Sequence, residues 1–200
     1  MSEKLYKITI IVTISVLLLF LFHSVSLENY DNFFPVGTTI ILIFLPLIIE
    51  KILKIEIPNS LKIFFIIFLF ASKFLGGNNF YYSTVFLYDK IIHTVYGIFA
   101  FFLSIFILIK SNSYNKNKMF FNIAFIISFI LATSVLWEFL EFGVDKLLHK
   151  NGQRLETGIS DTMFDLLGSF AASIILSIFY FIETKFKKNW LINKYINSIK

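Results

Sequence analysis

Six long runs of apolar residues constrain the fold of this chain more than any other feature of its sequence. A helix needs about 20 consecutive apolar residues to cross the hydrocarbon core of a bilayer, and the runs have about this length. Hydrophobic residues make up 57% of the chain, more than is usual for a soluble domain. We therefore predict an all-α, polytopic membrane protein with a single integral membrane domain over residues 1–200. The predicted membrane-spanning helices are residues 8–27, 33–53, 61–76, 86–109, 119–142 and 161–183.

Lysine and arginine are distributed unevenly between the two ends of these predicted helices. Thirteen of the 18 basic residues lie near the two termini or near the loops that follow the second and fourth helices. Cytoplasmic loops of membrane proteins carry an excess of basic residues, so we expect both termini in the cytoplasm. The expected location is the cell (inner) membrane, with the lipid bilayer as partner.

Charge and composition also exclude several functions. The net charge of +5 comes from lysines that flank apolar runs, and no phosphate loop or soluble DNA-binding pattern is present, so we expect no nucleic-acid partner. The chain has no cysteine, which excludes disulfides, thiolate metal sites and cysteine nucleophiles. It also has no G-x-S-x-G motif, which argues against a covalent serine mechanism.

Ionisable residues gather at one end of the last three predicted helices, and the segment WEFLEF at 137–142 is an example. Within each helix these residues are three or four positions apart, which places their side chains on one face. All three groups should lie at the outward end of the bundle. The residues concerned are Asp89, His93, Glu138, Glu141, Asp145, Asp161 and Asp165.

Small residues continue the same faces toward the middle of the membrane. The fourth predicted helix carries Gly97, Ala100 and Ser104, and the sixth carries Gly168 and Ala172. Small side chains let helices approach closely in lipid. We therefore expect the ionisable faces to point toward one another.

A carboxylate within the membrane costs about 2.5–3.5 kcal/mol at mid-bilayer and less toward the interface, so it is usually paired or functional. Three interpretations are open. A divalent metal ion is one, with ligands Asp89, His93, Glu138, Glu141, Asp161 and Asp165. This oxygen-rich set suits Mg²⁺, Mn²⁺ or Ca²⁺, and a catalytic zinc site stays open. The second interpretation is ion pairs with Lys73, Lys90, Lys146, Lys150 and Arg154. The third is a proton pathway through protonated carboxylates.

Some of these residues also have a simpler explanation. Asp161 follows Ser160 and would serve as an acid in the first turn of the sixth helix, and His93 would serve as a hydrogen-bonded interior histidine. Glu50, beside Lys51 near the inner interface, is expected to be solvated. Pro46 is expected to kink the second helix.

Three segments carry a resemblance to a known family: FLGGNNFYYSTVFLYDKIIHTVYG, LWEFLEFGVD and NGQRLETGISDTMFDLLG. Their order of motifs, D-K-x-x-H-x-x-x-G, W-E-x-x-E and D-T-M-x-D-x-x-G, resembles the YjdF-like family of bacterial membrane proteins. The same order of motifs also resembles that of the VanZ-like family, but that family tends to have Asn at the position of Asp165. The resemblance implies a helical-bundle fold but no reaction. It also implies a polar site made of Asp89, His93, Glu138, Glu141, Gln153, Asp161 and Asp165.

Three classes of function fit these features. The first is a metal-dependent hydrolase or transferase acting on a lipid or lipid-linked substrate, with His93 and Glu138 as catalytic proton carriers. Its substrate-binding residues would be Tyr82, Lys90, Gln153 and Arg154. The second is a non-catalytic binding or scaffold protein for envelope components. The third is an ion- or proton-coupled transporter, although charged residues are nearly absent from the inner halves of the helices, so no continuous polar path is visible.

Overall fold

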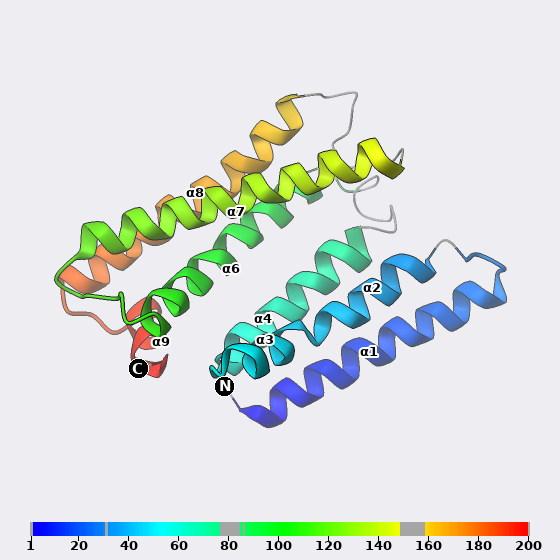
Figure 1. Ribbon diagram of the computed structural model, residues 1–200, viewed down its shortest axis with the longest axis horizontal. Coiled ribbons are helices and arrows are strands. Elements are labelled where there is room, and N and C mark those ends of the chain that lie inside the picture. Colours follow the sequence, from blue (N-terminus) through cyan, green and yellow to red (C-terminus); the bar gives the residue numbers. More distant parts are fainter. Residues whose placement is uncertain (1, 31, 77–84, 86, 149–158, 200) are drawn as a thin grey trace. The chain divides into compact units, whose positions relative to one another are not determined.

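The structure, a computed structural model, describes residues 2–30, 32–76, 85, 87–148 and 159–199. Every regular element in this part of the chain is a helix (Figure 1), and six helical segments are long and apolar enough to cross a membrane. The predicted all-α, multi-pass membrane fold is thereby confirmed. The elements are α1 (Glu3–Ser26), α2 (Phe33–Ile43), α3 (Leu45–Leu53), α4 (Asn59–Leu69), the π-helix η1 (Phe70–Gly76), α6 (Tyr88–Lys110), α7 (Met119–Leu148), α8 (Ile159–Lys185) and α9 (Ile192–Ile199).

Two of the long helices extend beyond their predicted ends. The first begins at Glu3, five residues before its apolar run, because the Ser2 side chain accepts a hydrogen bond from the Leu5 N–H and caps the helix. The fifth, α7, continues to Leu148, so Glu138, Glu141 and Asp145 all lie on a regular helix. Polar residues at a helix end therefore lengthen a spanning helix beyond its apolar run.

The chain forms two compact units, residues 1–92 and 93–200, and the boundary falls within the continuous helix α6. In the first unit, α1, α2, α4 and η1 pack around a core that includes Leu17, Val36, Ile43 and Ile66. The second predicted helix is divided at Phe44 into α2 and α3, with Pro46 in the first turn of α3. The interruption expected at this proline is confirmed.

Glu50 is not solvated, and the prediction for this residue is wrong. Its side chain is only 17% exposed and accepts hydrogen bonds from the Lys62 ammonium at 2.9 Å and from the Ile57 N–H at 2.8 Å. The lysine Nζ also lies 4.8 Å from the ring centroid of Tyr6 on α1. Lys54 adopts a left-handed conformation at the end of α3, and the reversal of the chain there brings Glu50 beside α4. The ion pair therefore joins α3 to α4, and the lysine joins both to α1.

Replacing Lys62 with alanine should destabilise the first unit by about 2–3 kcal/mol, because it leaves the Glu50 carboxylate largely buried without its cation. Thermal unfolding in detergent measures the effect. The matched control is Lys51→Ala, which removes an exposed lysine near the same carboxylate and should change stability by less than about 0.5 kcal/mol. Equal effects of the two substitutions would show that the ion pair contributes nothing.

In the second unit, α6, α7, α8 and α9 share a core that includes Phe101, Ile105, Ile126 and Tyr180. The short helix α9 is held by Glu183, a fully buried residue of α8. Its carboxylate accepts hydrogen bonds from the N–H groups of Leu191, Ile192 and Asn193 at 3.1, 3.1 and 2.8 Å. These groups lie at the start of α9, where N–H groups lack partners within the helix. A distant side chain thus supplies the cap.

Candidate functional site

Two of the predicted site residues lie in the first turns of helix α6. Asp89 lies one turn before His93, so both side chains lie on one face of the helix. The partial positive charge of a helix N-terminus favours a carboxylate at the position of Asp89. Its Oδ2 atom also lies 3.0 Å from the ammonium of Lys90. Lys90, predicted to bind substrate, therefore contacts a predicted metal ligand.

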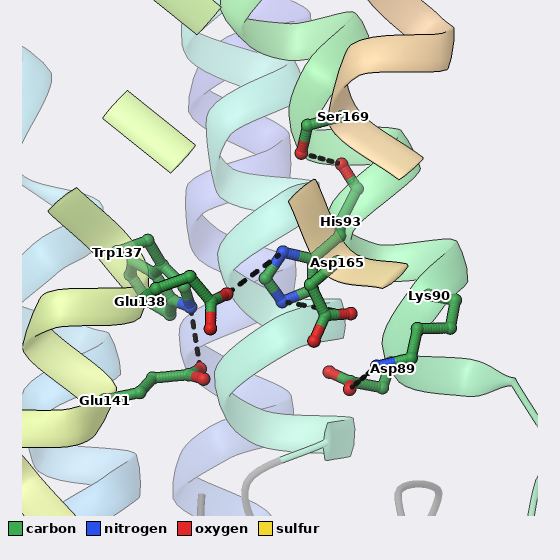
Figure 2. A network of polar contacts seen from close by, with 8 residues as sticks. All are labelled: Asp89, Lys90, His93, Trp137, Glu138, Glu141, Asp165 and Ser169. Carbon is green, nitrogen blue, oxygen red and sulfur yellow. Dashed lines mark hydrogen bonds and ion pairs between the residues drawn. The ribbon is translucent and has the colours of Figure 1, made fainter. Parts of the chain in front are cut away.

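The imidazole of His93 lies between two carboxylates that come from different helices (Figure 2). Its Nε2 atom is 3.8 Å from Oδ1 of Asp165 on α8, and its Nδ1 atom is 3.9 Å from Oε1 of Glu138 on α7. All three side chains are at most 6% exposed. Each distance is longer than a direct hydrogen bond. The two ring nitrogens thus face different acids.

Asp89, His93 and Asp165 together offer the ligands for a metal ion. One ligand atom from each lies within 4.8 Å of the others, and no other group of three or more His, Cys, Asp or Glu residues among the described residues does this. Ligand bonds of about 2.0–2.2 Å place the ligands of one ion roughly 3–4 Å apart. Small side-chain movements would therefore allow the three groups to bind one ion.

The remaining predicted ligands have other surroundings. Glu138 faces the Nδ1 side of His93, opposite the nitrogen that faces Asp165. The Glu141 carboxylate accepts a hydrogen bond of 2.7 Å from the indole N–H of Trp137 (Figure 2). Asp161 and Asp145 are buried on α8 and α7. In WEFLEF, the first glutamate therefore faces the histidine, and the second is held by the tryptophan one turn before it.

Electrostatics favours a cation in this region. Asp165 and Glu138 are buried on either side of the His93 ring, and Asp89 is partly buried beside Lys90 (Figure 2). When both are charged, the carboxylates of Asp89 and Asp165, whose ligand atoms lie within 4.8 Å of each other, repel one another at a cost in free energy. A bound divalent cation or a shared proton would lower that cost.

Close contact between α6 and α8 holds the site together. A Cβ atom on Gly97 would lie 2.7 Å from the backbone oxygen of Ser169 and 3.0 Å from Cβ of Ala172. The close approach expected at Gly97 is thereby confirmed. The Ser169 hydroxyl donates a hydrogen bond of 3.0 Å to the backbone oxygen of His93. Ser169 was not among the predicted site residues, although its position one turn after Asp165 was a usable signal.

Three of the four predicted substrate-binding residues, Tyr82, Gln153 and Arg154, lie outside the described residues. Their roles stay predictions.

Comparison with known proteins indicates that the chain is a membrane protein but gives no activity. A Thermotoga maritima protein described as uncharacterized is 32% identical over 138 residues, which cover 66% of this chain and 70% of the relative. No solved structure matches the chain. A family described as predicted membrane protein (DUF2238) matches residues 8–185. The chain therefore belongs to this family of membrane proteins.

Proposed function

We propose that this chain is a metal-dependent hydrolase or transferase of the cell (inner) membrane that acts on a lipid or lipid-linked substrate at the outer leaflet. The observation that carries the proposal is the buried group of Asp89, His93 and Asp165, whose ligand atoms lie within 4.8 Å of one another. The assignment to the YjdF-like family, from the motifs quoted above, is part of the proposal.

Each residue of the site has a role in this proposal. Asp89, Asp165 and Nε2 of His93 would hold the ion, which is Mg²⁺, Mn²⁺, Ca²⁺ or Zn²⁺. One imidazole with two carboxylates is also a ligand set used by catalytic zinc. When bound, the ion would polarise a phosphoryl or acyl oxygen and activate water. Glu138 would accept a hydrogen bond from the Nδ1–H of His93 and so orient the ring, as carboxylates commonly do for metal-bound histidines.

Metal binding provides the first test. Protein purified in detergent, stripped with a chelator and reloaded with each ion in turn should bind about one ion per chain of at least one type. The Asp165→Asn variant should weaken binding at least 100-fold because it removes the charge of a ligand. Glu138→Gln should weaken it by about 10- to 100-fold, the range typical of residues that support a ligand. The readouts are elemental analysis and the increase in Tm on metal addition.

The exposed acid Glu28 provides a matched control, and Glu28→Gln should bind metal like the wild type. If no ion binds to the wild-type protein under any of these conditions, the proposed metal mechanism is wrong.

Catalysis needs a separate test. Metal-loaded protein incubated with a total bacterial lipid extract should consume at least one lipid or lipid-linked species, as followed by mass spectrometry. The chelated protein and the Asp165→Asn variant should not. A metal-binding protein that consumes nothing in extracts containing lipid-linked envelope precursors would be a non-catalytic binding protein.

A further inference from the structure

A surface cavity of about 370 Å³ lies in the second unit, where α6 ends. About 25 Å of helix separates this end of α6 from His93 in its first turns, so the cavity is distinct from the candidate metal site. Segments far apart in the sequence form its walls, because α9 folds back beside the end of α6. The residues that line it are Ile109, Lys110, Asn112, Tyr114 and Ile199.

Hydrogen bonds fix the polar walls of this cavity. The N–H of Tyr114 donates to the backbone oxygen of Leu108 at 2.9 Å, and the N–H of Asn112 donates to that of Ile109 at 3.1 Å. Asn112 adopts the left-handed conformation, with φ 57°, which asparagine tolerates better than most residues. The Tyr114 hydroxyl accepts a hydrogen bond of 3.1 Å from Tyr180. The backbone bonds also satisfy carbonyl oxygens at the end of α6, which would otherwise oppose a bound anion.

Helix α9 supplies an apolar wall. It packs into the core of the unit through Ile196, and the Tyr195 hydroxyl donates to the backbone oxygen of Phe102 on α6 at 3.1 Å. The last described residue of α9, Ile199, is buried and lines the cavity together with Ile109. The cavity therefore offers apolar surface beside a lysine and an amide.

The surroundings of the cavity are strongly positive. Residues 110–118 and 183–199 contain seven lysines but only one acid, Glu183. The carboxylate of Glu183 is buried and accepts three hydrogen bonds from the start of α9. All seven lysines are exposed, and none pairs with a carboxylate in the part of the chain that the structure describes. Burial, and then the hydrogen bond with Tyr180, raise the pKa of Tyr114, so this wall adds no negative charge.

Membrane topology explains the lysines but not the cavity. The orientation of a membrane protein depends on the number of basic residues in its loops, and this requires neither a recess nor isoleucines beside a lysine. Lys110 is the last residue of a membrane-spanning helix, which places the cavity at the depth of lipid headgroups. Its volume lies at the lower end of the range for ligand sites and suits a headgroup better than a whole lipid. A soluble phosphate compound would use the lysine but not the apolar wall.

We propose that this cavity binds the headgroup of an anionic phospholipid from the leaflet at the lysine-rich end of the unit, which the lysine distribution assigns to the cytoplasm. Lys110 pairs with the lipid phosphate, and the Asn112 amide donates hydrogen bonds to the headgroup oxygens. Ile109 and Ile199 contact the glycerol and the first methylene groups. Basic pockets at the cytoplasmic ends of transmembrane helices bind anionic headgroups in other membrane proteins. This inference is independent of the metal and of the proposed reaction.

Native mass spectrometry of lipid complexes tests the proposal. The full chain, purified in detergent and depleted of lipid, is titrated with phosphatidylglycerol or with phosphatidylcholine of the same acyl chains. The wild type should bind one phosphatidylglycerol with at least tenfold higher affinity than phosphatidylcholine, because only the former has a net negative charge. Lys110→Ala should weaken phosphatidylglycerol binding at least tenfold. Lys110→Arg, which keeps the charge, should stay within about threefold of the wild type.

Two further variants separate a built site from general attraction. Lys118→Ala removes an exposed lysine of the same segment that does not line the cavity, and it should bind phosphatidylglycerol like the wild type. Asn112→Gly removes the amide but keeps the left-handed backbone, which glycine adopts readily, and it should weaken binding by about three- to tenfold with an unchanged Tm. Equal affinity for the two lipids, or equal losses in Lys118→Ala and Lys110→Ala, would overturn the proposal.

Competition and the metal site complete the test. Glycerol 3-phosphate, which lacks acyl chains, should displace phosphatidylglycerol only at concentrations at least 100-fold higher than those of the lipid. Displacement at similar concentrations would assign the cavity to a soluble phosphate compound and overturn the lipid proposal. Chelator and the Asp165→Asn substitution should leave phosphatidylglycerol binding unchanged, so the metal test and this test can fail separately. Loss of binding in Asp165→Asn would place the lipid at the His93 site and also overturn the proposal.

Discussion

Replacing Gly97 with alanine is expected to destabilise the protein by about 2–3 kcal/mol and to weaken metal binding at least tenfold. The added methyl group would lie 2.7 Å from the Ser169 backbone oxygen and 2.9 Å from the Ser169 Cα. Backbone atoms cannot rotate away as a side chain does, so α8 has to move, and overpacking of this kind costs about 1–3 kcal/mol. The movement would stretch the 3.0 Å hydrogen bond from Ser169 to His93 and shift Asp165 away from the imidazole.

Gly143 supplies the matched control for this prediction. A Cβ atom at Gly143 would have no neighbour within 4 Å, and alanine stabilises a helix by about 0.5–1 kcal/mol relative to glycine. Gly143→Ala should therefore raise the Tm slightly and leave metal binding unchanged. The two readouts are thermal unfolding and metal titration of each variant. If Gly97→Ala matches the wild type in both, the contact between α6 and α8 does not position the site.

Replacing Glu183 with alanine is expected to release α9 and to destabilise the second unit by about 4 kcal/mol. The substitution leaves three N–H groups without their acceptor, those of Leu191, Ile192 and Asn193. A buried donor that loses its partner costs about 1–3 kcal/mol. Water entering around α9 would offset part of the combined cost of the three donors. Amide exchange at 191–193 should become much faster, as measured by hydrogen–deuterium exchange mass spectrometry.

Two further variants test whether the charge of Glu183 matters. Glu183→Gln keeps an oxygen acceptor but no charge and should lose roughly half as much stability as the alanine variant, since hydrogen bonds to charged groups are about twice as strong as neutral ones. Glu3→Ala removes an exposed acid that pairs with Lys7 and should leave the Tm unchanged. Unchanged exchange at 191–193 in Glu183→Ala would mean that apolar contacts alone hold α9.

The spanning helices could be predicted because the bilayer sets one requirement on every segment. Any run of about 20 apolar residues satisfies it, so the six segments were visible before any tertiary contact was known. The spacing of Asp89 and His93 was equally accessible, because positions one turn apart on a helix share a face. Glu50 shows the limit of this reasoning: its partner Lys62 is twelve residues away, and only the reversal of the chain after α3 brings the two together.

The sequence by itself determined the fold class, the spanning segments and the faces that carry ionisable residues, because these follow from helical periodicity and the thickness of a bilayer. Tertiary structure decided which acids meet. It placed Asp165 and Glu138 on opposite sides of the His93 ring, and it left Ser134 and Ser177 buried without a protein partner among the described residues. The rotation of each helix about its axis and the distance between helices depend on contacts such as Gly97 against Ser169, which periodicity within one helix does not specify.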